Sequence, residues 1–185
     1  MFELDQFIFD CRTALRSEAP SQGVGEVVAR AVSEPGAMIQ ALGEPTRGGL
    51  LILHQADDLT VLNVVWPPWM TVPPHNHLMW AVIGVYTGRE DNIFWRRIGS
   101  SPDCKVEAVG ARALSTRDTT SLGRDIIHSV TNPIPRLTGA IHVYGGDFFA
   151  KPRSEWDAET LLEQPSDGEK AARRFDEANR RLLGG

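Results

Sequence analysis

Residues 73–88 of this chain read PPHNHLMWAVIGVYTG: a proline pair, a His-Asn-His triplet and an apolar run that ends at a glycine. Branched and aromatic residues in such a run favour a β-strand over Leu78–Tyr86, and Thr87-Gly88 predicts a turn after it. Side chains at positions i and i+2 of a strand point to the same face. We therefore expect His75 and His77 to present two imidazoles to one point in space.

A third histidine, His128, stands in a second apolar segment, Ile126–Thr131, that follows a Gly-Arg-Asp turn. Strands distant in sequence become neighbours in a closed antiparallel barrel, so His128 can meet the first pair. Imidazole ligands suit iron, nickel, copper and zinc. Each of the two histidine segments also has an interpretation without a metal. The His-Asn-His triplet could form a polar turn, and a lone histidine in a strand could be a hydrogen-bonded core residue.

The rest of the chain changes from helical to strand-like patterning near residue 49. Helical spacing of apolar residues predicts three helices within residues 2–42 and another over 168–182. Short strands with Gly/Pro turns indicate a β-sandwich or barrel. We expect the four prolines 67, 68, 73 and 74 to lie outside central strands and residues 145–167 to form a surface connection. The expected strands are Leu50–His54, Leu59–Trp66, Leu78–Tyr86, Asn92–Ile98, Lys105–Val109, Ala111–Ser115, Ile126–Thr131 and Leu137–Tyr144.

Composition and charge narrow the class of protein. The chain has 185 residues, enough for one domain with a core, and a net charge of −5, which opposes nucleic-acid binding. Two cysteines give no disulfide framework. No signal peptide and no apolar run of about 20 residues are visible, so we expect a cytoplasmic protein without a membrane segment. A homodimer is compatible with the sequence.

The two histidine segments resemble the two motifs of the cupin superfamily. Pro74-His75-Asn76-His77 through Gly88 is similar to the first motif, and Gly123 through His128 and Asn132 is similar to the second. The resemblance implies a mainly β fold, a double-stranded β-helix with N-terminal helices and a C-terminal helix. It also implies a metal site at His75, His77 and His128. The domain would be single, with a helical arm at 1–45, the barrel at 49–150 and an extension at 151–185.

One departure from the superfamily pattern points to a smaller group. The first motif normally carries a glutamate four residues after its second histidine, and this chain has Ala81 there. A three-histidine cupin resembles the thiol dioxygenases, the cysteine dioxygenase group in particular. Ala140-Ile141-His142-Val143-Tyr144 is similar to that group's Ser-x-His-x-Tyr strand, which implies catalytic roles for His142 and Tyr144.

The resemblance implies a mononuclear non-haem iron dioxygenase that oxidises a small thiol to a sulfinate with O₂. Iron(II) is the expected metal, with zinc, nickel or manganese as alternatives. Ala140 replaces the outer serine of the group's triad, and the group's carboxylate-binding arginine falls near Gly49 and Leu50, close to Arg47 but not aligned with it. Cysteine is thus a less favoured substrate than another small thiol.

Several further residues enter as weaker expectations. Met79 and Ala81 share a strand face with His77 and are expected to wall the substrate pocket. Arg96 is a candidate partner for a substrate carboxylate, and Glu90-Asp91 reads as an exposed charged turn. Two other functions stay open: a cupin that binds a metal and a ligand without redox activity, including a non-thiol metalloenzyme, and a metal-free binding module.

Overall fold

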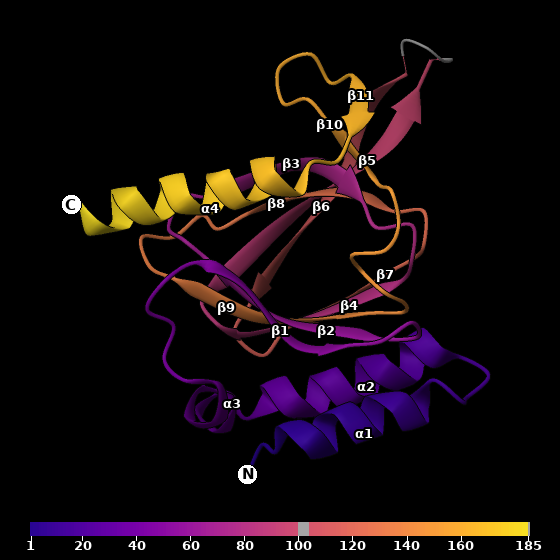
Figure 1. The fold of residues 1–185 in the computed structure, drawn as a ribbon, viewed down its shortest axis with the longest axis vertical. Helices are drawn as coiled ribbons and strands as arrows, with labels where there is room; N and C mark the ends of the chain where they lie inside the picture. Colours follow the sequence, from indigo (N-terminus) through magenta and orange to yellow (C-terminus); the bar gives the residue numbers. More distant parts are fainter. Residues whose placement is uncertain (100–103, 185) are drawn as a thin grey trace.

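Two antiparallel β-sheets lie face to face in the computed structural model, which describes residues 1–99 and 104–184 (Figure 1). One sheet has the strand order β1-β2-β9-β4-β7 and the other β11-β10-β3-β8-β5-β6. The strands are β1 (Gly49–Gln55), β2 (Thr60–Trp66), β3 (Thr71–Asn76), β4 (Ala81–Thr87), β5 (Arg89–Ile98), β6 (Lys105–Ser115), β7 (Thr119–Leu122), β8 (Ile127–Thr131), β9 (Thr138–Tyr144), β10 (Ser154–Trp156) and β11 (Glu163–Pro165).

The strand order defines a jelly roll. From β2 to β9 the chain passes back and forth between the two sheets, with β5 and β6 forming a hairpin within one of them. As a result, β2 pairs with β9, and β3 pairs with β8, so that segments far apart in sequence are neighbours. This arrangement is the double-stranded β-helix of cupin-like barrels. The expected mainly β fold, with helices at both ends of the chain, is confirmed.

Within the described part of the chain, four helices cover the barrel: α1 (Leu4–Ala14), α2 (Pro20–Ser33), α3 (Pro35–Leu42) and α4 (Gly168–Leu183). The first three pack on the outer face of the β1-β2-β9-β4-β7 sheet, while α4 runs across the opposite side of the molecule (Figure 1). Alternate residues of each strand therefore face either the helices or the barrel interior. In β9, Ile141 and Val143 contact the helices, whereas Ala140 and Tyr144 face inward. None of the described helices is long and apolar enough to span a membrane.

The structure corrects one expectation about prolines. Pro73 and Pro74 lie inside β3, between β8 and β10, and not in a loop. The β3–β8 register shifts between Val72 and His75, so the prolines occupy an irregular stretch where the ladder needs no amide hydrogen from them. Strand β3 ends at Asn76, and Leu78 then adopts a positive φ of 54° before β4 begins at Ala81.

Three other segment predictions change in detail. Residues 105–115 form one strand, with its register shift opposite Phe94 and Trp95, where two strands were expected. Strand β7 was not predicted. Residues 145–167 are more than a surface connection, because β10 and β11 within them extend the second sheet. These short strands lack a clear period of two, and tertiary pairing decides their conformation.

Candidate metal centre

The three candidate histidines converge on one point of the barrel interior. His75 of β3 stands directly opposite His128 of β8 in the strand register, and His77 follows just after β3. One ring nitrogen from each lies within 4.8 Å of the others. Nε2 of His77 is 2.9 Å from Nε2 of His128. Among the described residues, this group contains three histidines and no carboxylate.

Hydrogen bonds to the outer nitrogens orient two of these rings. Nδ1 of His75 lies 2.9 Å from the carbonyl oxygen of Pro73, and Nδ1 of His128 lies 2.7 Å from Oδ1 of Asn92. Both oxygens accept hydrogen bonds, so each Nδ1 carries the hydrogen and donates it. Nε2 of each ring is then left with its lone pair, as in histidines that bind metals.

The protonation states of the three histidines favour the binding of a metal cation. Burial lowers the pKa of His75 to about 4. Burial and the charge of the neighbouring histidines lower the pKa of His77 and His128 well below the ordinary 6.5. The imidazoles are therefore neutral near pH 7, and their lone pairs are available.

The cluster passes a simple test of fit to a metal ion. Nitrogens about 2.1 Å from one ion and at right angles to each other lie about 3 Å apart, close to the 2.9 Å between His77 and His128. Three neutral imidazoles in a buried site suit a first-row divalent ion better than calcium or magnesium, which prefer oxygen ligands.

His142 and Tyr144 face the same cavity from β9. Nδ1 of His142 lies 3.1 Å from the Tyr144 hydroxyl, and the Tyr144 ring is centred 5.0 Å from that of His77. Burial raises the pKa of Tyr144 above its ordinary value, so its hydroxyl keeps the proton. The structure thus brings both residues that were expected to be catalytic beside the three-histidine cluster.

Glu90 is not the exposed turn residue that the sequence suggested. Its side chain is fully buried and accepts hydrogen bonds from Trp66 Nε1 at 2.7 Å, Asn92 Nδ2 at 3.0 Å and His142 Nε2 at 3.2 Å. Burial by itself would raise the pKa of Glu90, but His142 and the hydrogen bonds outweigh it, and the pKa is lowered. Glu90 is the second residue of β5 and its side chain points into the barrel, whereas the side chain of the next residue, Asp91, points outward.

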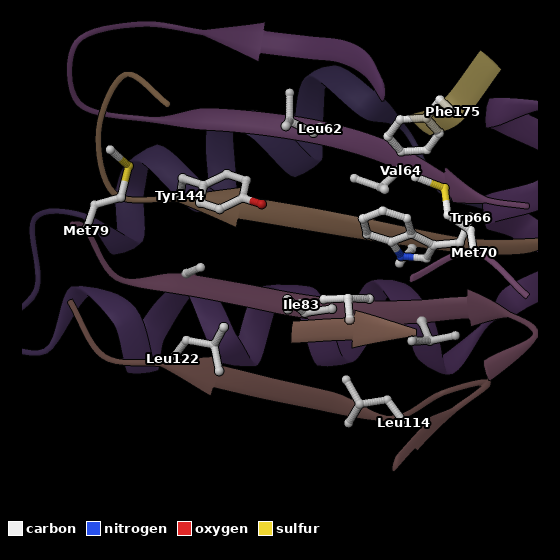
Figure 2. Close-up of a cluster of buried hydrophobic side chains, with 14 residues drawn as sticks. Leu62, Val64, Trp66, Met70, Met79, Ile83, Leu114, Leu122, Tyr144 and Phe175 are labelled. Carbon is white, nitrogen blue, oxygen red and sulfur yellow. The ribbon is translucent and has the colours of Figure 1, made fainter. Parts of the chain in front are cut away.

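A cavity of about 470 Å³ opens beside the cluster. Its walls include His75, His77 and His128, the inward side of β2, and helix α4 above. Figure 2 shows the buried apolar cluster between the sheets, and some of its members, among them Trp66 and Phe175, also line the cavity. The rings of Trp66 and Phe175 are stacked, with their centroids 5.6 Å apart. The space is thus polar at the histidines, and toward α4 it has both apolar side chains and the Arg47–Asp176 ion pair.

Three expected pocket residues are placed elsewhere. Met79 and Ala81 are buried in the apolar cluster between the sheets and do not border the cavity. Arg96 has a side chain that is 70% exposed and pairs with Glu107 at 2.6 Å, because this part of the β5–β6 hairpin faces solvent. Arg47 lines the cavity, but it pairs with Asp176 of α4 at 2.9 Å.

Arg153 is the cavity residue that sequence reasoning missed. Its guanidinium lies 3.7 Å from the ring centroid of Phe148, and burial lowers its pKa. In residues 1–99 and 104–184, no carboxylate pairs with it and no side-chain hydrogen bond reaches it. It stands alone before β10 in a segment without periodicity, so no sequence signal distinguished it from the other arginines.

Fold and site together define a jelly-roll protein with an open three-histidine cluster. No family model matches the chain. Among solved structures, it resembles an RmlC-like cupin family protein from Methanocaldococcus jannaschii, with a TM-score of 0.47, 8% identity and coverage of 57% of this chain and 86% of that one. It also resembles the DMSP lyase DddQ from Ruegeria pomeroyi DSS-3, with a TM-score of 0.47, 18% identity and coverage of 61% and 53%.

A third solved structure with a similar fold is an oxalate oxidase in complex with the substrate analogue glycolate. Its TM-score is 0.42, its identity is 15%, and the match covers 56% of this chain and 53% of that one. The chain therefore spans about half the length of the DMSP lyase and of this oxalate oxidase. These neighbours include cupin-family proteins and enzymes, and their likeness to this chain is one of fold.

Proposed function

We propose that this chain is a mononuclear non-haem iron dioxygenase that oxidises a small, carboxylate-bearing thiol to a sulfinate. The observation that carries the proposal is the three-histidine cluster without a carboxylate, open to a cavity that also holds the His142–Tyr144 pair. When bound there, iron(II) supplies the redox chemistry by which O₂ reacts with a thiolate. The reaction balances without a further reductant, since R–SH and O₂ give R–SO₂H.

The protein residues bind and orient the substrate. The unpaired guanidinium of Arg153 suits a carboxylate, which it can hold through two parallel hydrogen bonds. The contact with Phe148 fixes the guanidinium plane, so little side-chain freedom is lost when an anion binds. A carboxylate held at Arg153 leaves the sulfur end of a small thiol free to reach the histidines on the same cavity wall.

Tyr144 and the apolar walls control protons and water. The Tyr144 hydroxyl donates to Nδ1 of His142, so its oxygen lone pairs face the cavity and can accept a hydrogen bond from substrate. The side chains of Phe148 and Trp66 give the cavity apolar walls, which limit the water around a bound substrate. Exclusion of water strengthens each polar contact made there.

The test measures oxygen consumption by protein loaded anaerobically with iron(II). The panel pairs thiols with and without a carboxylate: cysteine against cysteamine, and 3-mercaptopropionate against 2-mercaptoethanol. We expect uptake of one O₂ per sulfinate formed, identified by mass spectrometry, with the carboxylate-bearing members preferred. Absence of oxygen uptake with all four thiols would reject the activity and leave a metal- and ligand-binding protein.

A substitution checks the substrate anchor. We expect Arg153→Gln to raise KM for the carboxylate-bearing thiols by about 10- to 100-fold, the value of a lost charge-assisted hydrogen bond, with a smaller change in kcat. Arg96→Gln is the matched control, because Arg96 lies at the surface. Equal KM values for wild type and Arg153→Gln would contradict the anchoring role.

A further inference from the structure

A continuous chain of hydrogen bonds joins the candidate ligand His128 to Tyr144 through Glu90. Nδ1 of His128 lies 2.7 Å from Oδ1 of Asn92, and Nδ2 of Asn92 lies 3.0 Å from Oε1 of Glu90. Oε2 of Glu90 lies 3.2 Å from Nε2 of His142, whose Nδ1 lies 3.1 Å from the Tyr144 hydroxyl. All five side chains are buried.

The direction of these hydrogen bonds is set at Glu90. The carboxylate accepts at both oxygens and is fixed further by the Trp66 indole, which can only donate. Asn92 must therefore turn its amide nitrogen toward Glu90 and its oxygen toward His128. That oxygen holds the hydrogen of His128 on Nδ1.

The second arm follows the same logic. His142 donates from Nε2 to Glu90, so its Nδ1 has a free lone pair and accepts the hydrogen of the Tyr144 hydroxyl. Ala140, which stands where the resemblance places a serine, offers no polar group to His142. Glu90 supplies that outer contact from another strand, in the opposite sheet.

We infer that Glu90 is a positioning residue that sets the tautomers of His128 and His142 together, so that one buried carboxylate orients both a metal ligand and the partner of Tyr144. The inference rests on the metal site of the proposed function. It extends beyond it, because Glu90 borders neither the cluster nor the cavity and acts only through other residues. Partners of this kind orient ligands and raise their basicity.

Substituting Glu90 by the isosteric glutamine tests the direction of the chain. The Trp66 indole requires the amide oxygen of Gln at the former Oε2 position, which places the amide nitrogen against Nδ2 of Asn92. Two donors then face each other. Asn92 relieves the conflict by rotating its amide, and its nitrogen then faces Nδ1 of His128. That imidazole must accept there, and its hydrogen moves to Nε2, the nitrogen that faces His77.

A double variant reverses the conflict. In Glu90→Gln/Asn92→Asp, the Gln amide nitrogen donates to one oxygen of the new aspartate, and the other oxygen accepts from Nδ1 of His128. Every polar group in the chain of hydrogen bonds has a partner again, and the negative charge has moved from residue 90 to residue 92. Asn92→Asp alone places two carboxylates against each other and is unfavourable. The wild type, the two single variants and the double variant therefore form a double-mutant cycle.

The readouts are zinc(II) affinity, measured by competition with a chromophoric chelator, and histidine tautomers, measured by ¹⁵N NMR on the metal-free protein. We expect Glu90→Gln to weaken zinc binding by about 10- to 100-fold. The double variant should return to within about threefold of the wild type. In the wild type, His128 should carry its hydrogen on Nδ1, and in Glu90→Gln on Nε2. Asp91→Asn removes a charge from the neighbouring, outward-facing residue and serves as the matched control.

Three outcomes overturn the inference: unchanged zinc affinity and tautomers in Glu90→Gln, failure of the double variant to recover, or a wild-type His128 with its hydrogen on Nε2. The position of the hydrogen on His128 is measured on the wild-type protein, so this test can be made even when a variant does not fold. Failure of the proposed function is separate, since absence of thiol oxidation leaves zinc affinity and tautomers measurable. A wild type that binds no zinc rejects the metal site, while the NMR still decides the role of Glu90.

Discussion

At the scale of single residues, Gly84 shows how closely helix α2 lies against the barrel. A Cβ atom at this position of β4 would lie 2.5 Å from Cγ1 of Val28 and 2.8 Å from Cγ1 of Val32. Both valines are fully buried, so neither can move aside without opening the packing. The glycine is needed here for space.

We predict that Gly84→Ala lowers the free energy of unfolding by about 1–3 kcal/mol, the usual cost of overpacking. For a chain of this size that corresponds to a fall in Tm of about 2–4 °C per kcal/mol. Thermal melts followed by circular dichroism measure it. Zinc affinity should stay unchanged, because the residue faces the helices and not the cavity.

The matched control is Gly36→Ala in α3, where an added Cβ meets no atom within 4 Å. Alanine is the better helix former by up to about 1 kcal/mol, so this variant should be as stable as the wild type or more so. If the Gly84→Ala variant had the same Tm as the wild type, α2 would have to lie farther from β4 than it does in this structure.

At the scale of elements, ion pairs with a buried carboxylate of β10 help to hold helix α4 to the barrel. Glu155 is 3% exposed and binds Arg174 through bonds of 3.0 and 3.1 Å and Lys170 at 3.1 Å. Burial favours a higher pKa for Glu155, but its two cationic partners outweigh burial and lower the pKa below 4.5. Since α4 also walls the cavity, this ion pair bears on the site.

The sign of the pH dependence follows from that lowered pKa. The unfolded chain binds a proton at Glu155 before the folded chain does, so the ion pairs stabilise the fold fully above pH 4.5 and are lost as the pH falls through the lower, folded value. We predict that Glu155→Gln lowers the free energy of unfolding at pH 7 by about 1–3 kcal/mol. At pH 3 the free energies of unfolding of the variant and the wild type should differ by less.

Denaturant unfolding at both pH values measures this difference, with the exposed Glu159→Gln as control. A difference between wild type and Glu155→Gln that grows on acidification would contradict the sign.

The elements also show why strand boundaries were harder to predict than strand existence. The apolar residues of β2 and β9 are buried on both faces of their sheet, so their composition alone marks them as strands. Strands β3, β10 and β11 pair with neighbouring strands although prolines and charged residues are uncommon in strands. Long-range hydrogen bonding decides these segments.

At the scale of the whole molecule, the three histidines join two strands that are distant in sequence. His75 and His77 belong to the β3 segment and His128 to β8, and the cluster forms only when the barrel closes. An ion bound there stabilises the folded state alone, because the unfolded chain separates its ligands.

We predict that zinc(II) at about 100 times its Kd adds about 2.7 kcal/mol to the free energy of unfolding, which raises Tm by about 5–10 °C. A chelator should reverse the shift. His128→Ala should abolish it, whereas His54→Ala, which alters a histidine of β1 outside the cluster, should retain it. A shift of equal size in His128→Ala would show that the metal binds elsewhere.

The sequence by itself determined the mainly β architecture, the helices at both ends and the three histidines that meet. Runs of apolar residues and the short spacing between His75 and His77 are local properties, which can be read from the order of the residues. Only the tertiary structure decided that Glu90 is buried beside His142, that Arg153 enters the cavity and that Arg96 does not. Charged residues look alike in sequence, and whether one loses its water depends on which distant strand or helix covers it.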